Sequence, residues 1–156
     1  MPTKDYTEFL HNIKQEYITN SYVVNDTFVF ELELPVKEHT CPQCHHTTKR
    51  IKDYRIRTVK FGMIQCGTLI GKYRQRRYCC THCGHAFSEQ NPFVRKYMQI
   101  SITNLALLFN KLNESITYTS IAHTCNVSIT TVLRYCSMIH IPKPNILPPV
   151  IGIDEF

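Results

Sequence analysis

The sequence has no apolar run that approaches the roughly 20 residues of a membrane span. Its first residues lack the apolar core of a signal peptide, and no internal repeat or low-complexity segment occurs anywhere. We therefore expect a cytoplasmic protein with no membrane partner. The 156 residues are 43% hydrophobic, which excludes disorder of the whole chain and suffices for one domain or a few small modules.

Positive charge is concentrated in the middle of the chain. Residues 41–100 carry twelve Lys/Arg and two Asp/Glu, whereas residues 1–40 carry three and seven, and residues 101–156 carry three of each. Such a basic segment favours a polyanionic partner, nucleic acid in particular. Because charge runs are more often solvated faces, charge alone does not decide the function.

Four of the eight cysteines form two CxxC pairs, Cys41 with Cys44 and Cys80 with Cys83. In a cytoplasmic chain cysteines are more often thiols or metal ligands than disulfides. Two CxxC turns supply the tetrahedral thiolate cage that Zn²⁺ prefers. The sequence therefore predicts a structural zinc site in a zinc-ribbon module over residues 41–92. The 35 residues between the pairs are enough for an enlarged β-hairpin.

Two alternatives for the cysteines stay open. A redox CxxC pair normally sits at a helix N-terminus, which explains one pair and not two. Cys79 and several histidines crowd the site, so that a Cys/His exchange at one ligand position is not excluded, nor is iron in place of zinc. These histidines are His45, His46, His82 and His85. The contexts of the other cysteines are typical of small core residues; they are Cys66, Cys125 and Cys136.

An N-terminal helix and a hairpin are expected over residues 1–40. Apolar spacing predicts a short helix over 5–17, and period-2 alternation predicts a half-buried strand over 27–34. Residues 18–24 can pair with that strand through the turn residues Asn25 and Asp26.

Cations alternate along the two extended stretches between the cysteine pairs. In a strand from Leu69 to Cys80, three cations share one face; they are Lys72, Arg74 and Arg76. Arg55 and Arg57 share a face of the neighbouring stretch. We expect metal-clamped strands to present these five cations to spaced phosphates, with Arg77 as a sixth candidate contact.

The region from residue 95 to 140 predicts three helices, over 101–113, 118–126 and 128–139. A helix-turn-helix unit needs a small residue where its helices cross and a residue tolerant of the left-handed conformation in the turn, and Ala122 and Asn126 fit these roles. Apolar residues fall at the positions that lock the two helices together: Ile121, Cys125, Val127, Val132 and Tyr135. Four polar residues would then face DNA from the last helix: Ser128, Thr130, Thr131 and Arg134. An ordinary three-helix bundle is the alternative, because one arginine is sparse for a helix that reads the major groove.

Five motifs in this order resemble the N-terminal half of insertion-sequence transposases of the ISL-three group. They are CPQC at 41–44, KDYRIRTVK at 52–60, RRYCCTHCG at 76–84, the helical stretch 115–139 and LPPVIGIDEF at 147–156. The resemblance implies that the zinc module and the helix-turn-helix bind the terminal inverted repeats of the element in double-stranded DNA. It also implies that residues 141–156 are a Pro-rich linker and the first strand of an RNase H-like core, in which Asp154 is the first of three carboxylates that hold Mg²⁺.

The expected protein is thus an α+β chain with an N-terminal hairpin, a zinc ribbon, a three-helix domain and a stub of a catalytic core. The second and third carboxylates are absent from it, so that we expect no catalysis alone and a need for Mg²⁺ only in a completed core. We expect a nucleoid-associated DNA-binding portion of a transposase, with a second copy or the full-length enzyme as candidate protein partners. We also expect residues 141–156 to be flexible or to pair with another chain. The alternatives are a zinc-dependent helix-turn-helix transcriptional regulator, half of a split transposase completed by a second polypeptide, and an RNA-binding zinc ribbon.

Overall fold

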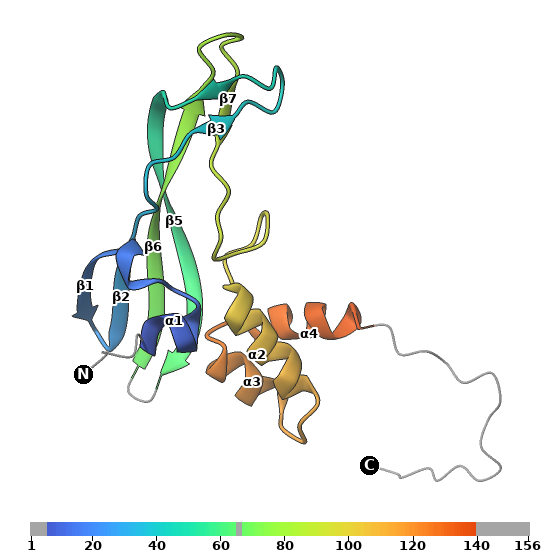
Figure 1. Ribbon diagram of the computed structural model, residues 1–156. Coiled ribbons are helices and arrows are strands. Elements are labelled where there is room, and N and C mark those ends of the chain that lie inside the picture. The colour runs from blue at the N-terminus through green and yellow to red at the C-terminus, as the bar shows by residue number, and fades with distance from the viewer. Residues whose placement is uncertain (1–5, 65–66, 140–156) are drawn as a thin grey trace, which may run out of the picture.

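The computed structural model describes residues 6–64 and 67–139. Within them the chain is a mixed α+β structure, with a sheet in the N-terminal part and three helices in the C-terminal part. Figure 1 shows an elongated shape that is set by one long hairpin. Asp154, and with it the linker and strand expected over 141–156, lies outside the described residues.

The long hairpin is formed by β5 (Ile51–Ile64) and β6 (Gly67–Cys79), which pair antiparallel along nearly their full length. A second hairpin, β1 (Ile18–Val24) and β2 (Thr27–Leu32), confirms the predicted pairing. Its two turn residues have positive φ, 46° for Asn25 and 59° for Asp26, as a tight hairpin turn requires.

The two hairpins form one sheet, because β2 pairs in parallel with β6. The strand order is β1-β2-β6-β5, and the short β7 (Ala86–Ser88) pairs with β6 further along. The strands β3 (His39–Thr40) and β4 (Thr47–Thr48) form a separate small pair. The N-terminal hairpin is therefore an integral part of the sheet that carries the basic strand β6.

The predicted helix over 5–17 is shorter in the structure. Helix α1 (Tyr6–His11) ends before Asn12, whose φ of 55° stops the helix, and a 3-10 turn follows at η1 (Gln15–Tyr17). The break lets the fully buried Ile13 enter the core on one face of the sheet. The other members of this core are Leu32, Val59, Phe61, Leu69, Tyr73 and Phe93.

The three predicted C-terminal helices are confirmed as α2 (Ile102–Leu112), α3 (Tyr118–Thr124) and α4 (Ile129–Ser137). Each begins after a Ser or Thr whose side chain accepts a hydrogen bond from a backbone N–H of the first turn. They enclose a second core, which comprises Ile100, Leu105, Leu108, Ile121, Ala122, Cys125, Val132 and Tyr135.

The helices are attached to β5 at Lys60. The Lys60 N–H donates to Gln99 O at 2.7 Å, and Ser101 N–H donates to Lys60 O at 2.9 Å. The amide of Asn104, only 1% exposed, donates to Cys125 O at 2.8 Å and to Lys60 O at 3.3 Å. A Cβ at Gly62 would lie 2.9 Å from Asn104 Oδ1, so that a glycine is needed where α2 meets the strand. This joint fixes the position of the helices at one end of the hairpin.

Candidate metal centre and nucleic-acid interface

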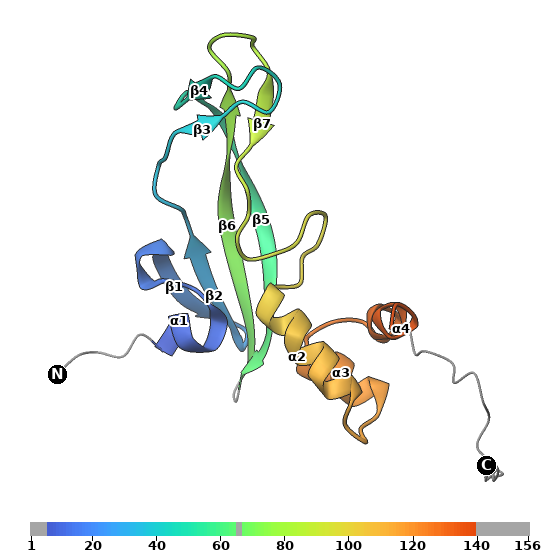
Figure 2. The same cartoon turned by 45° about the vertical axis from the view of Figure 1, so that its right-hand side comes forward.

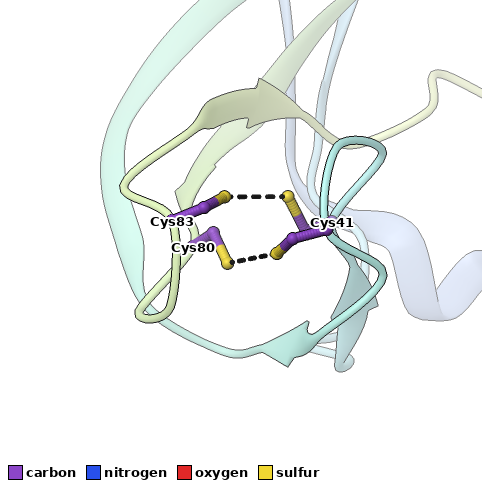
Figure 3. Close-up of side chains that lie close together, drawn as sticks. Cys41, Cys80 and Cys83 are labelled. Atoms are coloured by element: carbon purple, nitrogen blue, oxygen red, sulfur yellow. Dashed lines mark hydrogen bonds between the residues drawn. The ribbon is translucent and has the colours of Figure 1, made fainter.

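The four predicted cysteine ligands converge at the end of the hairpin where β5 begins and β6 ends. Cys41 Sγ lies 3.6 Å from Cys83 Sγ, and Cys44 Sγ lies 3.4 Å from Cys80 Sγ (Figure 3). All four sulfur atoms lie within 4.8 Å of one another. Zn–S bonds of about 2.3 Å in a tetrahedron place the sulfurs about 3.8 Å apart. The cluster therefore has the size to hold one metal ion, as expected for structural zinc.

The two CxxC turns have the same backbone hydrogen bonds. In the first, His45 N–H donates to Cys41 O at 3.0 Å and Cys41 N–H donates to His46 O at 2.9 Å; Gly84 N–H and Cys80 N–H make the equivalent bonds at 3.0 and 2.9 Å. The residue after each pair has positive φ, 60° for His45 and 73° for Gly84. His45 thus adopts the conformation that a glycine adopts in the second turn.

Cys80 in the second CxxC turn favours the thiolate form. Hydrogen bonds from the backbone N–H groups of Cys83 and His82 lower the pKa of Cys80 to about 6. The pKa of Cys83 in the same turn is raised, because desolvation and the neighbouring thiols of Cys41 and Cys80 disfavour a second thiolate. A metal ion needs its cysteine ligands deprotonated, and Cys80 is the thiol of this turn that is more readily ionised.

Two histidines lie close enough to the cysteine cluster for one of them to replace a cysteine as a metal ligand. The imidazoles of His46 and His82 stack at 3.9 Å between ring centroids, and their nitrogens lie within 4.8 Å of Cys44 Sγ. Cys79 turns away, with its Sγ 3.6 Å from Gly84 O. Cys125 is fully buried in the helical core as expected, and Cys136 is half-buried. Cys66 lies outside the described residues.

The metal site and the helices lie at opposite ends of the molecule. In Figures 1 and 2 the strands β3, β4 and β7 surround one end of the β5–β6 hairpin, whereas α2, α3 and α4 lie beside its other end. The cysteine cluster therefore belongs to the sheet part of the molecule and lies away from the helical segment.

The predicted surface of five cations is not formed. Arg57 pairs with Tyr73 across the strands, and Ile56 pairs with Arg74, so that Arg55 and Arg57 point to one face of the sheet while Lys72 and Arg74 point to the other. Alternation showed which residues of one strand share a face. It did not show how the two strands are aligned.

Arg76 is buried, so that the prediction of a contact between Arg76 and a phosphate is wrong. The residue is 2% exposed, and its guanidinium pairs with Glu33 and lies 3.6 Å from Glu89. Glu89 in turn accepts hydrogen bonds from Tyr73 Oη at 2.7 Å and from Arg76 N–H at 2.8 Å. Burial, and the hydrogen bond from Tyr73 Oη to Glu89, raise the pKa of the Tyr73 hydroxyl. Arg76 is part of an internal polar network.

Other cations of β6 also have partners within the chain. Arg77 pairs with Asp53 at 2.9 Å. Arg74 pairs with Glu33 at 3.3 Å and lies 3.9 Å from the centroid of the Tyr54 ring. The Lys72 ammonium donates to Tyr22 Oη at 2.8 Å, and this hydrogen bond raises the pKa of Lys72. Glu33, just after β2, forms ion pairs with Arg74 and Arg76 of β6, and Glu31 of β2 lies beside Lys72. Part of the charge separation seen in the sequence is therefore neutralised in the folded chain.

The predicted polar face of α4 is accessible. Ser128, Thr130 and Arg134 are exposed, and Thr131 is half-buried. The hydroxyl of Ser128 lies 2.9 Å from those of Thr130 and Thr131 and also caps α4. Within the described residues Arg134 has no ion pair with a carboxylate. The turn before α4 has Asn126 at φ 51°, as expected, and Val127 N–H donates to Ala122 O at 2.9 Å.

Comparisons with protein-family models, with curated proteins and with solved structures find no match to this chain. Among the described residues, no helix has the length and apolar character to cross a bilayer.

Proposed function

We propose that this chain is the DNA-binding portion of an insertion-sequence transposase, and that it recognises the terminal inverted repeats of its element through the α3–α4 unit. The observation that carries the proposal is the division of α4 into two faces. Val132 and Tyr135 are buried in the helical core, while Ser128, Thr130 and Arg134 are exposed, together with the apolar Ile129 and Leu133. A helix-turn-helix presents its second helix to the major groove in this way.

Zinc in the four-cysteine cluster would have a structural role in this proposal. It would fix the far end of the hairpin in the manner of a zinc ribbon, and the hairpin in turn carries the helices through the joint at Lys60. Arg55 and Arg57 would add phosphate contacts, because both are exposed and neither has an ion pair with a carboxylate in the described part of the chain. Arg77 and Arg74 would have to leave their ion pairs to do so.

A salt-titrated mobility-shift assay tests the proposal. The metal-loaded chain is titrated into duplex carrying the terminal inverted repeat and into scrambled duplex of the same composition. We expect tighter binding to the repeat, by the roughly 1–3 kcal/mol that each base-specific contact contributes. Equal affinity for both duplexes would remove sequence recognition, and preference for a promoter sequence over the repeat would favour a transcriptional regulator.

A further inference from the structure

A cleft of about 540 Å³ lies between α4 and the segment that leads from the sheet to α2. One wall is formed by α4, with Ser128, Thr131 and Arg134. The facing wall is formed by the segment before α2, with Lys96 and Tyr97, and Lys60 of β5 also lines the cleft. The cleft thus adjoins the polar face of α4 and extends it onto a different part of the chain.

The cleft is positively charged, and its cations have no carboxylate partner within the described residues. Lys60, Lys96 and Arg134 line it, and no Asp or Glu does. In residues 6–64 and 67–139 no carboxylate lies within 4.0 Å of any of these three cations. This distinguishes them from Arg74, whose guanidinium pairs with Glu33. The positive charge near α4 that no carboxylate of the described residues neutralises therefore gathers in this cleft.

The donors of the cleft suit phosphate oxygens. Lys60 Nζ donates to Asn126 O at 3.3 Å, which holds the ammonium beside the start of α4 and leaves two of its N–H bonds for a ligand. The hydroxyls of Ser128 and Thr131 lie 2.9 Å apart, and both residues line the same cleft. Cations and hydroxyl groups together are the usual partners of DNA phosphates.

Tyr97 is a strained residue with an exposed ring. It lies in a turn closed by a hydrogen bond from Met98 N–H to Arg95 O at 3.0 Å, at a position with φ 67° where Gly or Asn is usual. The residue is 93% exposed, so that no packing within the described structure compensates for this conformation. An aromatic ring held at the wall of a phosphate-sized cleft is placed to pack against a sugar of the same backbone.

We propose that this cleft holds a backbone phosphate of duplex DNA, with Lys60, Lys96 and Arg134 as its cationic partners and Tyr97 against the adjoining deoxyribose. The inference rests on the proposed function and adds to it a contact that fixes the register of α4 on the duplex. Because a phosphate carries no sequence information, the contact contributes equally to specific and non-specific binding.

Neighbouring residues give a matched test. The variants Lys96→Gln and Arg95→Gln each remove one exposed positive charge, but only Lys96 lines the cleft. Binding of the metal-loaded full chain to repeat and scrambled duplexes is measured by fluorescence anisotropy from about 50 to 200 mM salt. We expect Lys96→Gln to weaken binding to both duplexes by the same factor. Combined with Arg134→Gln it should reduce the slope of log K against log salt by about 1. Arg95→Gln should leave the slope unchanged.

Tyr97→Gly separates a ligand contact from a structural role. Glycine adopts positive φ without strain, so that the variant should melt no lower than the unmodified protein, yet bind both duplexes several-fold more weakly. Unchanged binding by Tyr97→Gly would overturn the sugar contact. If Lys96→Gln behaves as Arg95→Gln while the unmodified protein binds DNA, the cleft is wrong and the proposed function stands. If the unmodified protein binds neither duplex, both fail.

Discussion

At the scale of single residues, two groups of side chains bring distant parts of the chain together. Four thiols lie within 4.8 Å of one another, close enough to hold a metal ion. Glu33 and Glu89 pair with the buried guanidinium of Arg76. Substitution within either group has a specific expected result.

The cysteine cluster allows a test with a neighbouring control. Cys80→Ser removes a ligand, whereas Cys79→Ser alters a thiol that turns away from the other four. We expect elemental analysis to find one metal ion per chain in the unmodified protein and in Cys79→Ser. Cys80→Ser should lose affinity by more than the roughly 10–100-fold that loss of an outer partner costs. Full metal occupancy in Cys80→Ser would instead indicate a histidine ligand such as His82.

The buried network around Glu89 gives a second prediction for a single residue. Glu89→Ala leaves the buried guanidinium of Arg76 and the hydroxyl of Tyr73 without this partner, so that we expect a loss of about 3–5 kcal/mol in the free energy of unfolding. Glu114→Ala is the control, because its pair with Lys111 is exposed and contributes about 0–1 kcal/mol. Urea unfolding measures both. A cost below about 1 kcal/mol for Glu89→Ala would contradict the assigned role.

At the scale of helices and strands, local patterns were sufficient for most elements. The β1–β2 hairpin and the helices α2, α3 and α4 were predicted because turn residues, N-caps and apolar periodicity act over a few residues. The parallel pairing of β2 with β6 was not, because it joins residues about forty positions apart. That pairing brings carboxylates beside the cations of β6, since Glu31 of β2 lies opposite Lys72 of β6.

The sheet and the helices should respond differently to metal removal. Near the cysteine turns the chain has few buried side chains besides Cys41, Cys80 and Tyr78, whereas α2, α3 and α4 enclose a core of their own. Chelation should therefore abolish amide-exchange protection over residues 39–48 and 79–88. The amides of α4 should remain protected. Loss of protection in the helices to the same extent would show that the metal supports the whole chain.

At the scale of the whole molecule, the β5–β6 hairpin joins two ends that carry different groups of side chains. One end gathers four thiols, and the other carries the helices with the exposed polar face of α4 and its adjoining cleft. The sequence placed the nucleic-acid contacts mainly on the basic strands. The ion pairs of Arg74, Arg76 and Arg77 move that expectation toward α4, whose neighbouring cations have no ion pair with a carboxylate in the part of the chain that the structure describes.

Titration of the ¹⁵N-labelled, metal-loaded chain with terminal-repeat duplex, followed by two-dimensional NMR, tests this account most directly. It predicts that the amide signals of residues 95–99 and 126–135 shift, while those beside the four cysteines stay in place. Shifts confined to the β5–β6 hairpin would move the DNA-binding surface to the sheet, and an unchanged spectrum would contradict the proposal that the chain binds DNA.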